Sequence, residues 1–139
     1  MRERDGGTGL RLIDPSYVAR LARLPGAGGQ DLASELLGRF AASLPATFAQ
    51  LRALADAGDS ATLMRDAHSM RGTALLLGAS DFAERADRLE CDARAANVAS
   101  AHAHVDTLAA EWPATHAALL AACAAASVTR PSGPWSPAD

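Results

Sequence analysis

The chain contains no lysine, because all 13 of its basic residues are arginine, so no lysine amine can act in any site. Aromatic residues make up only 4% of the 139 positions, and alanine and leucine dominate the remainder. This composition favours helices packed on helices. No apolar run reaches the roughly 18 residues that a transmembrane helix needs, and the N-terminus lacks the layout of a secretory signal. We therefore expect a soluble, cytoplasmic, all-α protein without direct membrane insertion.

Charge and cysteine content narrow the possible partners and cofactors. The formal net charge is −3, which gives no basic surface for a phosphate backbone and argues against nucleic acid as a partner. The two cysteines, Cys91 and Cys123, lie far apart and form no Cys-x-x-Cys pair. Both fall on apolar stripes of predicted helices, so we expect two buried free thiols.

The length fits one domain with a single core, which we place at residues 10–127. Residues 1–9 are charged and glycine-rich, and we expect this N-terminus to be disordered. Residues 128–139 contain three prolines, and we expect them to form a flexible tail.

Start and stop signals divide the middle of the chain into five predicted helices. Asp14 before Pro15 starts the first helix, Gly58 and Gly78 end the second and third, and Ser80 caps the fourth. The predicted ranges are 15–24, 31–57, 60–77, 81–96 and from 98 onward.

The arrangement of these helices follows from their connections. Pro45 and Pro113 lie inside the second and fifth patterns, where we expect a bend and not a break. Short connections between long amphipathic helices imply antiparallel neighbours. The sequence therefore predicts an antiparallel up-down four-helix bundle, with the short N-terminal helix packed on one end.

His68 is predicted to project away from this core. A helix advances about 100° per residue, which gathers the large and small apolar residues of the third helix on one side. His68 lies about 140° from the middle of that side, so core packing does not explain it. The apolar residues that define the buried side are Leu63, Ala67, Met70, Ala74 and Leu77.

Residues three, four or seven positions from His68 share its outer face. Met64 and Leu75 are apolar at positions that are expected to face solvent, which suggests a docking surface. Arg65 lies beside them. We predict that Met64, Arg65 and Leu75 bind a partner.

Arg71 and Gly72 add the features of a phosphoacceptor. A glycine inside a helix is about 1 kcal/mol less favourable than alanine, and here it would let another surface approach the imidazole. The Arg71 guanidinium favours a neutral, nucleophilic ring and would stabilise a phosphoryl group attached to it. The spacing of His68, Arg71 and Gly72 thus supplies a nucleophile, a counter-charge and clearance.

The stretch "AHSMRGTALLLGASDFAERADRLE" resembles the signature of the histidine-containing phosphotransfer (HPt) domains of bacterial phosphorelays. That pattern reads roughly His-x-Leu-Lys-Gly-Ser/Ala, then Gly-Ala, an apolar residue and a Leu-Glu pair. The family usually has lysine where this chain has Arg71. The resemblance covers roughly residues 10–126, and its motif positions are His68, Met70, Arg71, Gly72, Thr73, Gly78, Ala79, Phe82, Leu89 and Glu90.

The resemblance implies an HPt four-helix bundle that works as a phosphorelay intermediate. His68 would accept a phosphoryl group, through Nε2, from the aspartyl phosphate of a receiver domain and pass it to another receiver. The receiver would supply Mg²⁺ and most of the catalysis, so the chain would need no cofactor of its own and would have no independent kinase activity.

The implied partners are receiver domains of response regulators or of hybrid sensor histidine kinases, and we expect a monomer. The chain would be a stand-alone protein or the C-terminal domain of a membrane-bound hybrid kinase. The alternative function is an HPt-like bundle that binds or regulates proteins without phosphotransfer.

The remaining polar candidates receive simpler interpretations. His102 and His104 are two positions apart and face different directions, and His116 has no partner at ligand spacing, so no metal site is predicted. Asp87 and Glu90 are expected on a solvated helix face, with bracing of the bundle as the alternative for Glu90.

Overall fold

The computed structural model describes residues 12–129, which are all-α apart from one isolated β-bridge between Pro25 and Asp31. The predicted disordered residues 1–9 and residues 130–139 of the predicted tail lie outside the described residues, whereas residues 128 and 129 of that tail belong to the last helix. None of the helices in the described part is both long and apolar enough to cross a membrane. The helices are α1 (Pro15–Leu21), α2 (Leu32–Ala57), α3 (Ser60–Leu77), α4 (Ser80–Arg94) and α5 (Val98–Thr129).

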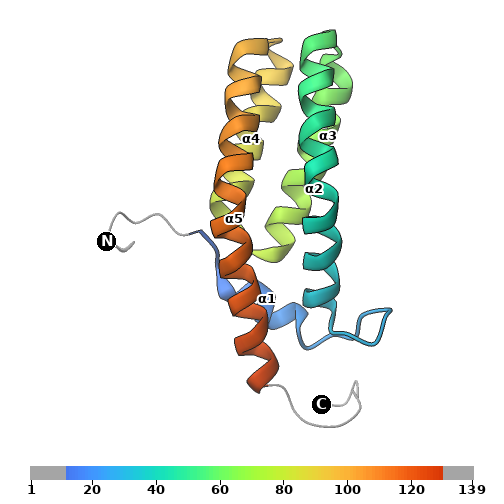
Figure 1. Cartoon of the computed structure of the whole chain (residues 1–139), viewed down its shortest axis with the longest axis vertical. Coiled ribbons are helices and arrows are strands. Elements are labelled where there is room, and N and C mark those ends of the chain that lie inside the picture. The colour runs from blue at the N-terminus through green and yellow to red at the C-terminus, as the bar shows by residue number, and fades with distance from the viewer. Residues whose placement is uncertain (1–11, 130–139) are drawn as a thin grey trace, which may run out of the picture.

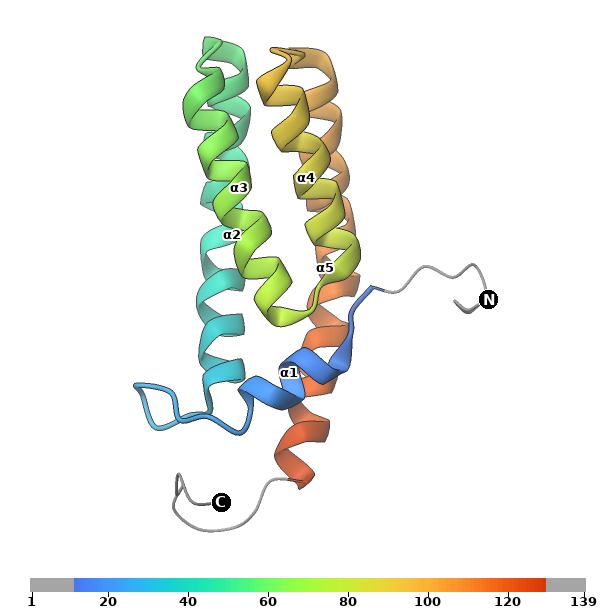
Figure 2. The ribbon, with the colours of Figure 1, turned by 180° about the vertical axis from the view of Figure 1, so that it is seen from behind.

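Helices α2 to α5 stand side by side and run alternately up and down, which confirms the predicted bundle (Figure 1). Helix α1 lies across the end at which α3 turns into α4, and α5 extends past that end (Figure 2). Neither Pro45 nor Pro113 ends its helix, as predicted. Helix α1 stops at Leu21, three residues before the predicted end.

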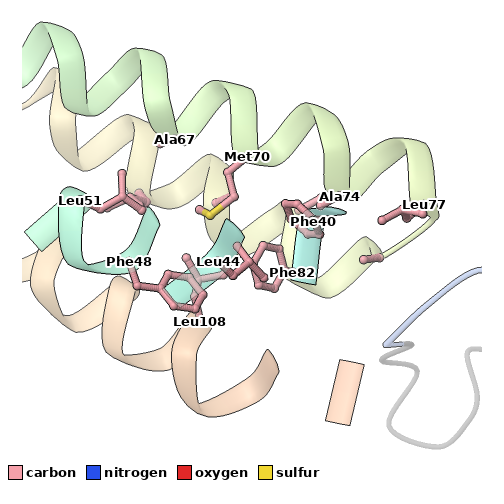
Figure 3. Packing of buried hydrophobic residues seen from close by; sticks show 14 of the residues in the cluster. Phe40, Leu44, Phe48, Leu51, Ala67, Met70, Ala74, Leu77, Phe82 and Leu108 are labelled. Carbon is pink, nitrogen blue, oxygen red and sulfur yellow. The ribbon is translucent and has the colours of Figure 1, made fainter. Parts of the chain in front are cut away.

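The core is formed by the apolar stripes of the four long helices. The predicted stripe of α3 is buried at every position, and Figure 3 shows four of its residues, Ala67, Met70, Ala74 and Leu77, on the side of α3 that faces the core. The rings of Phe40, Phe82 and Trp112 meet edge to face, with centroids 5.5–5.8 Å apart, and tie together α2, α4 and α5. The orientation of the outer face of α3 is therefore fixed by packing.

Only one of the two cysteines is buried as predicted. Cys123 lies in the core, and burial raises the pKa of its thiol. The prediction for Cys91 is wrong, because this residue is exposed. It lies two positions from both Leu89 and Ala93, which are buried, and a shift of two positions on a helix turns a side chain by about 200°.

The turn between α3 and α4 is tighter than the sequence suggested. Ser80 is the first residue of α4 and does not cap it; the cap position is Ala79, which offers no side-chain acceptor. Gly78 ends α3 in the left-handed conformation, with φ of +77°. Its carbonyl accepts a hydrogen bond from the Asp14 amide at 2.7 Å, and this bond attaches the start of α1 to the turn.

Gly78→Ala should destabilise the fold far more than Gly58→Ala, which is its matched control. Both glycines have positive φ, so both substitutions incur the roughly 1–2 kcal/mol of a left-handed alanine. A Cβ at Gly58 meets open space, whereas one at Gly78 would lie 2.5 Å from the Asp14 carbonyl oxygen. Urea unfolding should show the larger loss for Gly78→Ala, and equal losses would contradict the close approach of α1.

Candidate phosphoacceptor site

His68 lies on the outer face of α3, opposite the buried stripe. Its side chain is 65% exposed, which confirms the predicted orientation. Asp59 caps the start of the helix by accepting a hydrogen bond from the Thr62 amide. The hydroxyl and amide of Thr62 both hold the pKa of Asp59 below its ordinary value. His68 is therefore carried in the middle of a capped, well-packed helix.

Glu90 of α4 contacts the inner nitrogen of the His68 ring. The distance from His68 Nδ1 to Glu90 Oε1 is 3.3 Å, and the Glu90 side chain is only 12% exposed. Its other oxygen, Oε2, lies 3.5 Å from Nη2 of Arg94. The prediction that Glu90 is solvated is wrong. Its contact with His68 of α3 agrees with the alternative, in which Glu90 braces the bundle.

A hydrogen bond between Glu90 and a neutral His68 ring requires the ring proton to be on Nδ1. A neutral imidazole carries one N–H, and a carboxylate only accepts hydrogen bonds. A proton on Nδ1 is therefore stabilised by Glu90, which leaves the lone pair on Nε2. With the ring two-thirds exposed, this arrangement can present Nε2 as a nucleophile.

Arg71 lies between two carboxylates of α4. Its Nε is 3.7 Å from Asp87 Oδ1, and its Nη1 is 4.0 Å from Glu90 Oε1. Asp87, which was expected to be simply solvated, is thus half-exposed but paired across the α3–α4 interface. Arg71 and Glu90 both adjoin His68, so the site contains a cation and an anion beside the ring.

Gly72 opens space next to His68. A Cβ placed on Gly72 would meet no atom within 4 Å outside its own helix backbone, so the fold itself does not require glycine here. The clearance lies on the solvent side of α3.

The three predicted partner-binding residues occupy different depths. Leu75 and Arg65 are exposed, whereas Met64 is half-buried and packs partly against the core. Their part in partner binding stays a prediction.

The other histidines have structural partners. His102 Nε2 lies 2.7 Å from Asp56 Oδ1, His104 Nε2 lies 3.3 Å from Asp92 Oδ2, and His116 stacks on Trp112. Within residues 12–129, no group of three His, Cys, Asp or Glu side chains is arranged to hold a metal ion.

The fold and the site together define a small helical bundle that presents one histidine on the outer face of an antiparallel helix pair. The family model of the Hpt domain matches residues 35–125, about two thirds of the chain. The chain belongs to this family, whose domains carry out histidine phosphotransfer in two-component signalling. No curated protein and no solved structure matches the chain.

Glu90→Ala should change the tautomer of His68. In the parent protein, the neutral ring should carry its proton on Nδ1, because Glu90 accepts a hydrogen bond there. Without the carboxylate, the population with Nε2–H should rise. Nitrogen-15 NMR of the ring at alkaline pH measures both forms. Glu84→Ala removes a carboxylate of the same helix that pairs with Arg88, and it should leave the tautomer unchanged. A parent ring with its proton on Nε2 would contradict this role of Glu90.

Proposed function

We propose that the protein is a phosphorelay intermediate in which His68 accepts a phosphoryl group from the aspartyl phosphate of one receiver domain and passes it to another. The observation that carries this proposal is the pairing of His68 Nδ1 with the poorly exposed Glu90 while the ring itself stays largely in solvent. A solvent-facing nucleophile with a fixed tautomer suits transfer between proteins.

The proposed transfer step needs no second reacting group from this chain. The Nε2 lone pair attacks phosphorus, the N–P bond forms, and the P–O bond to the receiver aspartate breaks, so that aspartate leaves as a carboxylate. The proton of the ring stays on Nδ1. The phosphorylated ring then carries a positive charge, which the Glu90 carboxylate 3.3 Å away offsets. Passing the group on is the reverse of this step. Mg²⁺ belongs to the receiver in this scheme, and no residue of this chain is assigned to it.

Arg71 and Gly72 have supporting roles in the proposal. The Arg71 guanidinium pairs with phosphoryl oxygens, since arginine binds such groups through a planar fork of donors. Gly72 leaves room for the edge of the receiver, because nothing lies where its side chain would be.

The proposed partners are receiver domains of response regulators or hybrid sensor kinases, docked over His68 with Met64, Arg65 and Leu75 at the contact. Leu75 is the most exposed apolar member of this set. This function belongs in the cytoplasm, either in a stand-alone protein or in the cytoplasmic part of a longer kinase.

His68→Gln should abolish phosphate uptake. The protein is mixed with Mg²⁺ and a receiver domain phosphorylated by a small-molecule donor, and acid-labile, base-stable phosphate is measured. The parent and a control, His102→Gln, should both become labelled, because His102 pairs with Asp56 on another face of the bundle. Label on His68→Gln, or on none of the three proteins, would refute the proposal. Receiver binding that persists without any label would instead favour the binding-module alternative.

Gly72→Leu should block transfer without unfolding the bundle. Gly38→Leu is the matched control, because Gly38 also lies inside a helix with open space at its Cβ position. Leucine favours a helix over glycine by roughly 0.5–1 kcal/mol, so both variants should be at least as stable as the parent. Only Gly72→Leu should slow transfer from the receiver, because only it crowds His68. Equal transfer rates in the two variants would remove the clearance role of Gly72.

A further inference from the structure

Arg71 lies near two carboxylates through two different nitrogens, which the single ammonium of a lysine does not offer. Two separate nitrogens of its guanidinium, Nε and Nη1, point to Asp87 and to Glu90, which lie three residues apart on α4. A planar guanidinium can face two acceptors at once, whereas a lysine ammonium is a single point charge on a flexible stem. The residue that departs from the family pattern is therefore matched to carboxylates on the facing helix.

The two carboxylates differ in how easily they release Arg71. Glu90 is poorly exposed and also contacts His68 and Arg94. Asp87 is 51% exposed, and its Oδ1 lies 3.7 Å from Nε of Arg71. A half-exposed pair at this distance is weak and exchanges readily. Asp87 is thus the partner that Arg71 can exchange for another anion at the lowest cost.

We propose that Asp87 is a positioning residue that competes with the phosphoryl group on His68 for Arg71 and so limits the lifetime of the phosphohistidine. This inference rests on the proposed function of His68. In the unphosphorylated protein, Asp87 keeps Arg71 on the α4 side. After phosphorylation, the guanidinium divides its time between Asp87 and the phosphoryl oxygens, which carry the larger negative charge.

The direction of the effect follows from the chemistry of hydrolysis. Water attacks phosphorus, the N–P bond breaks and inorganic phosphate leaves. The ring departs as a neutral imidazole because it keeps the proton on Nδ1. Hydrolysis therefore proceeds through the positively charged, Nδ1-protonated phosphohistidine. A carboxylate nearby stabilises that positive ring, and a guanidinium nearby destabilises it. Removing the Asp87 charge frees Arg71 to stay at the phosphoryl group, beside the ring, and this slows hydrolysis.

The experiment uses the whole chain and a chemical donor, so that no receiver is involved. The protein is phosphorylated with phosphoramidate, the donor is removed, and the phosphohistidine half-life is followed by phosphorus-31 NMR. Asp87→Asn should lengthen the half-life about two- to fivefold, which is the range that one half-exposed ion pair can contribute. Asp87→Glu keeps the charge and should stay close to the parent.

Two controls separate this role from a general charge effect. Glu84→Gln removes a similarly exposed carboxylate from the same helix, but its partner is Arg88, so the half-life should not change. In an Arg71→Ala background, adding Asp87→Asn should have little further effect, because Asp87 acts through Arg71. The Arg71 Nε–H resonance should also shift on phosphorylation of the parent.

The results distinguish the inference from the function on which it rests. A half-life that Asp87→Asn leaves unchanged, or changes equally with and without Arg71, would overturn the role of Asp87 while His68 remains the acceptor. A folded parent that takes up no phosphate on His68 would overturn the proposed function and this inference with it.

Discussion

The close contact between the α3–α4 turn and the start of α1 is the constraint on which the arrangement of the bundle depends. Gly78 must be left-handed to end α3, and it must lack a side chain because the Asp14 carbonyl occupies the space that a Cβ would need. The Asp14 amide in turn satisfies the Gly78 carbonyl. One glycine thus ends a helix, starts its antiparallel neighbour at Ser80 and anchors α1, and a side chain at Gly78 would disturb all three together.

The same turn assembles the site. In an antiparallel helix pair with a tight turn, residues equally far from the turn face one another. His68 and Glu90 lie eleven residues before and after Ala79, and Arg71 and Asp87 lie eight before and after it. Both cross-helix pairs therefore follow from one register. A longer connection would have shifted α4 along α3 and separated the ring from its carboxylate, without any change in the residues themselves.

This register explains what sequence reasoning could and could not predict. Helical periodicity orients a residue relative to the core of its own helix, and that was enough to place His68 outward and the α3 stripe inward. It says nothing about which residues of the next helix lie opposite, so the sequence alone predicts a solvated face for Glu90 and Asp87. Both pairs can be predicted by taking the Gly78-Ala79 turn as the centre of the helix hairpin and counting equal numbers of residues outward from it. Cys91 was misplaced for a different reason: its small apolar side chain was assigned to a stripe that α4 fills with Leu89 and Ala93.

The weakness of the ion pairs around His68 suits the carrier role proposed for it, in contrast to the rigidity of the core below it. A group that is both accepted and passed on must be bound with nearly equal free energy in the carrier and in its partners. Half-exposed ion pairs such as Arg71 with Asp87 contribute at most about 1 kcal/mol each, so exchanging a carboxylate for a phosphoryl oxygen changes the balance only slightly. A fully buried cation at the same place would hold the phosphoryl group too tightly, because its charge would be left unpaired on release. The bundle therefore combines an orientation fixed by packing with electrostatic contacts that are easily exchanged.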